Sequence, residues 1–355
     1  MPSHIRSDSC LRTSTLSPFQ VLFEEFKAYY GEATFPNAWV TGALGGTEAG
    51  SGAGGATTKV TSANGHVADF ETVNDDATRE QAIKKGTVQM ILWPYAIHEL
   101  ESAQGKCGTD EEGSLHYLDE AVAFYTGSLV GEDATGATKG KLMFGLSQSR
   151  CKDFVTCGDG ASTSGLATSN KKVFAKFDEF KAAIKASNCG ALKGLTKEIT
   201  DAGYTAIIQG TLKYGSVVGK GGASAKYKAE AATFAMAILP RVNTCSAASA
   251  KTIYDNLMIG AASTDFAAVQ AALEANYACM GVTCADVGAY TKDGEQLTTP
   301  CSDGLGAGPL IGIIAGGVVA VGVLVGVLVK TGVLKLGGKA AAKTSSAAAS
   351  STVSA

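Results

Sequence analysis

Apolar residues recur at helical spacing along most of the chain, with polar residues in the positions between them. Within residues 81–131 the apolar positions fall into two groups, namely Ile83, Met90, Ile91 and Tyr95, followed by Leu118, Ala121, Val122 and Tyr125. This spacing predicts an antiparallel pair of helices joined across residues 107–115. Pro94 lies inside the first helix, where it removes one backbone hydrogen bond and is expected to bend the helix.

The chain also contains two similar halves. The segment FEEFKA, which starts at Phe23, resembles FDEFKA at Phe177, and YLDEAVAFYTGSL at Tyr117 resembles YKAEAATFAMAIL at Tyr227. The order is the same in both halves, and the Gly-rich stretch 42–58 makes the first half longer. We therefore predict an internal duplication with about four helices in each copy, the number found in an up-and-down bundle. The helices are expected near 18–31, 78–104, 115–130 and 139–153, then near 170–187, 191–218, 225–240 and 248–280.

The C-terminal part of the chain has the pattern of a membrane span. Leu310–Val329 is a run of 20 uncharged residues, long enough to cross a bilayer as a helix. Lysines follow it at 330, 335, 339 and 343, which predicts a cytoplasmic tail. Residues 1–17 lack the apolar run of a targeting signal, and we leave them unassigned. The expected order after them is a first bundle (18–157), a linker (158–170), a second bundle (171–284), a stalk (285–308), a transmembrane helix (309–329) and a low-complexity tail (330–355).

Composition narrows the fold class and the possible partners. Alanine-rich helical runs with 44 glycines and only 7 prolines favour an all-α protein with Gly-rich loops. Leaving the four tail lysines out of the net charge of −3 gives −7 for the preceding residues, a charge unsuited to nucleic acid. Eight of the nine cysteines lie between Cys107 and Cys301, which indicates four disulfides formed in an oxidising compartment, with Cys10 left over and the pairing open.

The predicted helix pair carries oxygen and nitrogen donors at helical spacing. Residues three apart share one helix face, and oxygen donors suit a hard, highly charged cation such as ferric iron. A Tyr-x2-Glu-x3-Phe set occurs in both halves, but the first half has the richer donors because Asp119 and Tyr125 correspond to alanines in the second. The same side chains also fit a structural role in caps and core, and that alternative stays open. The candidate metal ligands are Tyr95, His98, Glu101, Tyr117, Asp119, Glu120 and Tyr125.

No motif of an enzyme is complete. The segment HELE at His98 resembles the zinc protease box H-E-x-x-H, but Ser102 stands where the second histidine is required. The nucleophile elbow G-x-S-x-G and the phosphate-binding Walker motif do not occur. We therefore expect a binding protein rather than an enzyme.

Several long segments resemble one protein family. These are IKKGTVQMILWPYAIHELE, LDEAVAFYTGSLVGEDATG, SQSRCKDFVTCG, IIQGTLKYG and ACMGVTCADVGAY. They are similar to the algal iron-assimilation family, which includes the low-iron-inducible periplasmic proteins of green algae and the phytotransferrins of diatoms and other marine algae. The resemblance covers residues 19–290, and a weaker one links the architecture and the His-x2-Glu element to imelysin-like proteins.

The resemblance implies a cell-surface protein that binds ferric iron, with carbonate as a synergistic anion, and takes it up by internalisation. It places the chain in the plasma membrane as a single-pass protein with the bundles outside, and in endosomes after uptake. Endocytic machinery or a reductase would be its partners. A surface interaction or adhesion protein that binds no metal is the alternative function.

Overall fold

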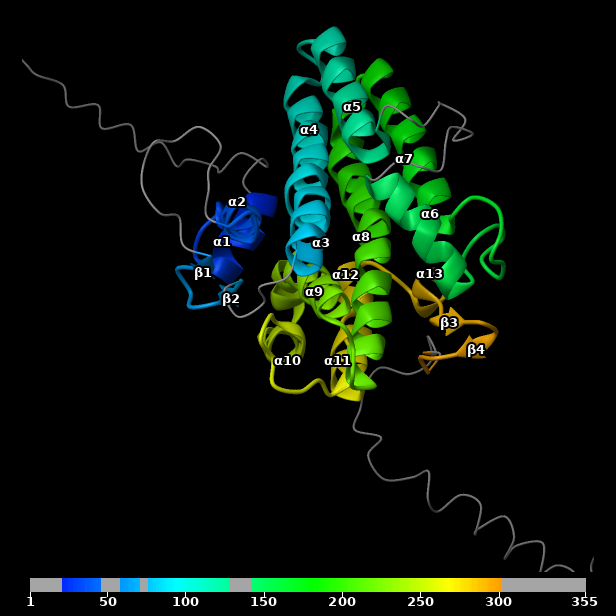
Figure 1. Cartoon of the computed structure of the whole chain (residues 1–355). Helices are drawn as coiled ribbons and strands as arrows, with labels where there is room; N and C mark the ends of the chain where they lie inside the picture. The colour runs from blue at the N-terminus through cyan, green and yellow to red at the C-terminus, as the bar shows by residue number, and fades with distance from the viewer. Residues whose placement is uncertain (1–20, 46–57, 71–75, 128–141, 300, 302–355) are drawn as a thin grey trace, which may run out of the picture. The chain divides into compact units, whose positions relative to one another are not determined.

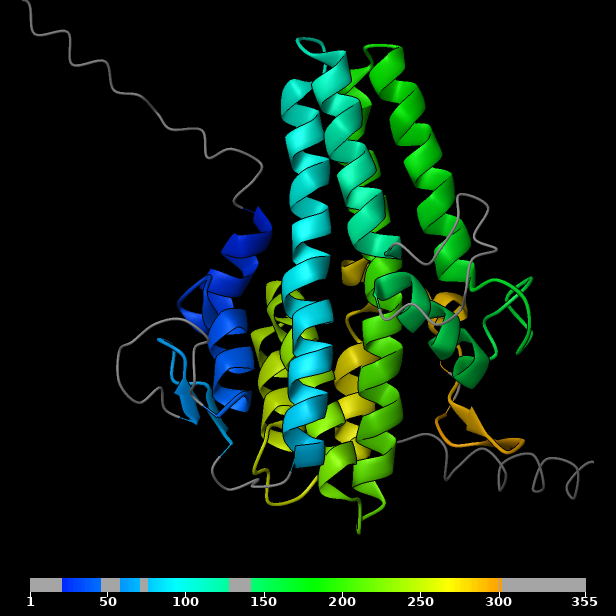
Figure 2. The same cartoon turned by 45° about the horizontal axis from the view of Figure 1, so that its top comes forward.

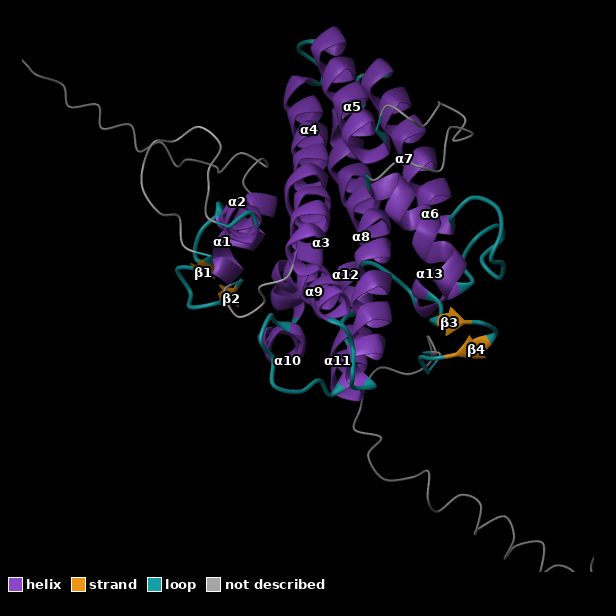
Figure 3. Cartoon of the chain, viewed as in Figure 1, coloured by secondary structure: helices purple, strands orange, loops and turns teal. Residues whose placement is uncertain are grey.

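Helices make up most of the structure, a computed structural model that describes residues 21–45, 58–70, 76–127, 142–299 and 301 (Figure 3). The prediction of an all-α protein is confirmed within this part of the chain. Two short antiparallel hairpins were not predicted, β1 (Lys59–Thr61) with β2 (Val67–Asp69) and β3 (Thr291–Lys292) with β4 (Glu295–Gln296).

The longer helices lie close to the predicted positions, whereas the helix over Phe35–Ala43 was not predicted (Figure 1). Their bounds are α1 Val21–Tyr30, α2 Phe35–Ala43, α3 Asp76–Gly86, η2 Thr87–Leu92, α4 Trp93–Lys106, α5 Glu111–Thr126, α6 Met143–Phe154, α7 Thr168–Lys185, α8 Cys189–Gly219, α9 Ala225–Cys245, α10 Ala247–Leu257, α11 Phe266–Glu274, α12 Tyr277–Met280 and α13 Cys284–Val287. The helix expected over 248–280 is divided into three, because Gly260 adopts a positive φ of 86° and Asp265 caps a new helix through the Ala268 amide.

Two groups of helices pack around two long elements, which are the rod formed by α3, η2 and α4 and the long helix α8 (Figure 2). In one group α4 packs on α5 and α8, while α7 packs on α5 and α8. In the other, α9 packs on α1, α3, α8 and α10. Each group therefore draws helices from both predicted halves of the sequence. The internal duplication stays a prediction.

The first long element is a continuous rod in which α3 and α4 are joined by η2, a π-helical turn. Pro94 lies at the start of α4, directly after this turn. Proline has no N–H to donate to the carbonyl four residues earlier, and its ring crowds that carbonyl. The sequence predicted a bend at Pro94. In the structure, the turn directly before the proline is π-helical, which is wider than an α-helical turn.

Helix α9 also contains a proline, and a side chain replaces the backbone hydrogen bond that this proline removes. Pro240 lies inside α9 and is buried. It cannot donate a hydrogen bond to the carbonyl of Met236, four residues earlier. The buried hydroxyl of Tyr30 donates to that carbonyl over 2.6 Å. This bond attaches α1 to α9 and satisfies an acceptor that would otherwise be buried without a partner.

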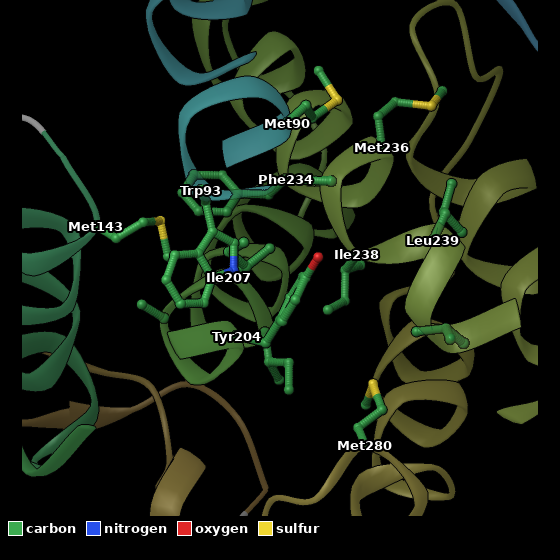
Figure 4. Close-up of a cluster of buried hydrophobic side chains, with 14 of the residues drawn as sticks. Met90, Trp93, Met143, Tyr204, Ile207, Phe234, Met236, Ile238, Leu239 and Met280 are labelled. Carbon is green, nitrogen blue, oxygen red and sulfur yellow. The ribbon is translucent and has the colours of Figure 1, made fainter. Parts of the chain in front are cut away.

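The core lies where α4, α8 and α9 meet, and Figure 4 shows Trp93, Tyr204 and Phe234 within it. The helices approach closely at two glycines of α8. A Cβ added to Gly203 would overlap the ring of Trp93, and one added to Gly210 would overlap the ring of Phe234. Both rings are fully buried, so these positions require glycine for the observed packing.

Four disulfides confirm the expected framework and show its pairing. The bonds are Cys107–Cys189, Cys151–Cys157, Cys245–Cys279 and Cys284–Cys301. The first joins the end of α4 to the start of α8. The last holds residues 284–301 in place, where Tyr290 is 2% exposed, so this part of the predicted stalk folds against the helices. Cys10 lies outside the described residues.

The predicted transmembrane helix at 309–329, the tail and residues 1–17 also lie outside the described residues. Within the part of the chain that the structure describes, no helix combines the length and the apolar character needed to cross a bilayer.

Candidate metal centre

Local contacts bring α4 and α5 together as an antiparallel pair. The helix α5 begins at Glu111 because Asp110 caps it, accepting a hydrogen bond from the Gly113 amide over 2.8 Å. The hydroxyl of Ser114 then donates to the carbonyl of Ala103 over 2.7 Å, in a fully buried contact. The predicted pairing of these two helices is confirmed.

Four polar side chains meet on the outer face of this pair, and we call them the α4–α5 cluster: Tyr95 and Glu99 from α4, His116 and Glu120 from α5. The carboxyl of Glu99 interacts with both the Tyr95 hydroxyl and the Glu120 carboxyl. On the solvent side, Nε2 of His116 lies 3.2 Å from Oε1 of Glu120. Tyr95 is 42% exposed whereas Glu99 is 3% exposed, so the cluster extends from solvent to a buried carboxylate.

Burial and neighbouring negative charge shift the pKa values of Glu99 and Tyr95. Burial raises the pKa of Glu99, the hydrogen bond from Tyr95 lowers it, and the neighbouring Glu120 raises it again. The charge of Glu99, together with the hydrogen bond to it, raises the pKa of Tyr95. In addition, Oε2 of Glu99 is buried and has no hydrogen-bond partner among the residues that the structure describes. A cation bound here would satisfy that oxygen and relieve the repulsion between the two carboxylates.

The remaining predicted ligands lie at different distances from this cluster. The ring of His98 is 5.6 Å from the ring of Tyr95, and burial lowers the pKa of His98. Tyr117 is half-buried next to His116, with 6.1 Å between the ring centres. Asp119 is exposed on the outer side of α5.

The structure separates Tyr125 from the α4–α5 cluster. Its ring is fully buried against Trp93, with 5.7 Å between the ring centres. Its hydroxyl donates to the side-chain oxygen of Asn170 over 2.6 Å. Burial raises the pKa of Tyr125 far above its usual range, which opposes the phenolate form that a metal requires. Its observed place is in the core.

Glu101 also points away from the α4–α5 cluster. It lies in a cavity of about 300 Å³ between α1, α4, α8 and α9, which we call the Glu25–Glu101 pocket. Burial raises the pKa of Glu101 to about 8, and the charge of Glu25 contributes in the same direction. The predicted ligands of α4 are therefore divided between two places.

Neither place is a complete metal site of the common kind. Among the described residues, no three His, Cys, Asp or Glu side chains are already grouped as metal ligands. The α4–α5 cluster is a series of pairwise contacts, from Tyr95 to Glu99, to Glu120 and to His116, rather than a set of donors already placed around one point. Phenolate and carboxylate oxygens with an imidazole nitrogen fit a hard ion that also binds nitrogen, such as ferric iron.

Glu99, His116 and Glu25 were not among the predicted site residues. The predicted face joined residues three apart, such as Tyr95 and His98, although a residue four apart lies closer in angle around an α-helix. By that rule Glu99 is the nearest neighbour of Tyr95, and His116 is the nearest neighbour of Glu120. Glu25 contacts the pocket only through tertiary packing, for which the sequence carried no signal.

Comparison with known proteins shows a family match. The profile of a family described as low iron-inducible periplasmic protein matches residues 27–307, which include both long elements and the α4–α5 cluster. No curated protein and no solved structure matches the chain.

Proposed function

Because the chain belongs to the low iron-inducible periplasmic protein family, we propose that it binds ferric iron outside the cytoplasm, for uptake, at the α4–α5 cluster. The family description concerns proteins made when iron is scarce and located outside the cell membrane. In the proposed role the protein binds iron before the iron is transported, and the proposal assigns it no catalytic step.

The observation that supports this site is the contact of the phenol of Tyr95 with the buried carboxylate of Glu99, next to Glu120. Three oxygen donors from two helices meet there, and the imidazole of His116 adjoins them. These donors do not fill the coordination sphere of a ferric ion. Carbonate, which the resemblance to phytotransferrins implies, would occupy the remaining positions.

The same donors make binding sensitive to pH. Phenolate and carboxylate oxygens bind metal only when deprotonated, so iron binding releases protons and acid weakens it. Since the pKa values of Tyr95 and Glu99 are already raised, protons compete with iron strongly at this site. Acidification after internalisation would therefore release the iron.

A spectroscopic titration tests the site. Mixing the protein with a ferric salt and bicarbonate should produce a visible charge-transfer band from the tyrosinate–iron bond. Tyr95→Phe should abolish this band. Tyr227→Phe is a matched control, because Tyr227 is 40% exposed on α9 and Tyr95 is 42% exposed on α4. The band should weaken on acidification and on removal of bicarbonate.

Two results would contradict the proposal in different ways. If Tyr95→Phe kept the full band, iron would be bound by another tyrosine and the assignment of the site would be wrong. If the unmodified protein bound no ferric iron in bicarbonate buffer, the proposed function itself would be wrong.

A further inference from the structure

A cavity of about 660 Å³ lies where α8 ends and α9 begins, and we call it the Lys228 pocket. Two loops contribute to its walls, residues 220–224 between α8 and α9 and residues 258–265 between α10 and α11. Its described lining includes no residue of α4 or α5, so it is separate from the α4–α5 cluster. A volume of this size is typical of pockets that bind small molecules.

Contacts among the described residues fix the walls of the Lys228 pocket. The last residue of α8 lies against α11, because a Cβ added to Gly219 would be 2.7 Å from the Cβ of Phe266. After α10, the side-chain oxygen of Asn256 accepts from the Asp265 amide over 2.6 Å, and the Thr264 hydroxyl donates to the Asn256 carbonyl over 2.8 Å. These bonds hold the second loop in one shape, so a ligand would enter a pocket that is already formed.

The inner surface of the pocket is mainly apolar. Leu257 and Ile259 line it and are only 3% and 5% exposed, and Val218 and Met258 are half-buried beside them. Alanine and glycine make up most of the remaining described lining, which leaves flat walls against which an apolar group can pack. Burial of an apolar surface here would therefore supply binding free energy.

The charges at the pocket favour an anion. Lys228 is the only charged residue of the described lining, and its ammonium group forms no ion pair with a described residue. The first four residues of α9 also include Lys226, and the first turn contains no acidic side chain. Positive side chains at a helix N-terminus add to the partial positive charge of the helix dipole. The pocket thus differs in sign from the whole chain, whose net charge is −3.

We propose that the Lys228 pocket binds a small amphipathic anion, with its apolar body against Leu257 and Ile259 and its anionic head group next to Lys228. The two parts of such a ligand match the apolar interior and the unpaired ammonium group of the pocket. An ion pair with an exposed lysine adds only a small part of the affinity, but it determines which charge the pocket prefers. Iron takes no part in this binding, which would be a second function of the chain.

The fluorescent probe anilinonaphthalene sulfonate tests the site, because it combines an aromatic body with one negative charge. Its fluorescence should rise on addition of the full-length protein. Ala261→Phe, on the loop after α10, should weaken binding of the probe about tenfold, because the new ring occupies the space of the ligand. Ala223→Phe, on the facing loop, should do the same and covers the case in which the first variant does not fold. Ala248→Phe is the matched control, since Ala248 is exposed on α10 outside the described lining.

A second pair of variants tests the recognition of charge. Lys228→Gln should raise the Kd of the probe about fivefold, the contribution of one exposed ion pair. Lys226→Gln is its control, since Lys226 is exposed on the same helix outside the described lining. Octanoate should displace the probe from the unmodified protein at lower concentration than octanol, and this order should be reversed in Lys228→Gln. Inorganic phosphate should not displace the probe.

Each part of the proposal can fail separately. If Ala261→Phe and Ala223→Phe both bound the probe as tightly as Ala248→Phe, the pocket would not be the binding site. Equal Kd values for Lys228→Gln and Lys226→Gln would show that the pocket does not select an anion. Displacement by phosphate would show that the apolar body is not required. All of these variants should keep the tyrosinate–iron band, so the proposed function is tested independently.

Discussion

Two glutamates of α4 that are two residues apart belong to different sites. Successive residues of an α-helix are rotated by about 100°, so Glu99 and Glu101 point in nearly opposite directions. Glu99 faces α5, whereas Glu101 faces the pocket formed with α1, α8 and α9. The sequence predicted that Tyr95 and Glu120 would meet, because both lie on a helix pair that is recognisable from its apolar spacing. It did not separate Glu101 from them, because the identity of the facing helix is a tertiary property.

The buried carboxyl of Glu101 should make the metal-free protein less stable as pH rises. Its pKa in the folded chain is about 8, above the usual 4.5, because of burial and of Glu25. Below pH 4.5 the group is protonated in both states, and the free energy of unfolding falls as pH rises from 4.5 to 8. Glu101→Gln should match the unmodified protein at the acid end and be more stable by about 2 kcal/mol at the alkaline end, less than the full linkage value because relaxation of the surrounding protein screens the charge.

Urea unfolding of the metal-free proteins at the two ends of that range measures this difference. Glu295→Gln is the control, since Glu295 is exposed on β4. A stability difference between Glu101→Gln and the unmodified protein that did not grow with pH would contradict the raised pKa.

At the scale of elements, the long helices were predictable but their interruptions were not. The Ala-rich apolar spacing indicated α8 almost to its ends, observed at Cys189–Gly219. The π-helical turn η2 was not predicted, because one added residue in a turn leaves the apolar pattern nearly unchanged. The glycines of α8 had no visible role in the sequence. In the structure, Gly203 and Gly210 lie where buried aromatic rings from other helices contact the backbone of α8.

We expect Gly203→Ala to destabilise the protein although alanine favours helices. Its Cβ would overlap the buried indole of Trp93, and overpacking of this kind costs about 1–3 kcal/mol. Gly194→Ala is the matched control, because Gly194 lies in the same helix with nothing near its added Cβ. That variant should gain up to about 1 kcal/mol from helix propensity. Thermal unfolding of both variants checks the prediction, which fails if the two changes have the same sign.

At the scale of the whole molecule, the number of disulfides followed from the cysteine count, but their pairing required the fold. Cys107 and Cys189 are 82 residues apart and meet because α4 and α8 pack side by side. Cys151 and Cys157 are only 6 residues apart. The all-α class was predictable from composition, whereas the way in which each helix group combines both halves of the chain depends on long-range packing.

These two disulfides should contribute unequally to stability. Closing a longer loop removes more entropy from the unfolded chain, and the difference between these two loops is about 2 kcal/mol in the loop-entropy relation. Replacing Cys107 and Cys189 by alanine should therefore lower the denaturation midpoint more than replacing Cys151 and Cys157. Chemical denaturation under non-reducing conditions measures both. Equal losses would show that the entropy of the unfolded chain does not control this stabilisation.

The turn η2 also determines which side chains α4 offers to its neighbours. A π-helical turn contains about one residue more than an α-helical turn, so it accommodates an added residue without rotating those that follow. If Thr87–Leu92 closed into an ordinary helix with all of its residues retained, every later residue would rotate by about 100° relative to α3. Tyr95 and Glu99 would then turn away from α5 without any change in their identity. Loss of one residue from this segment, by contrast, could be accommodated by closing the turn, and the donors of α4 would keep their direction.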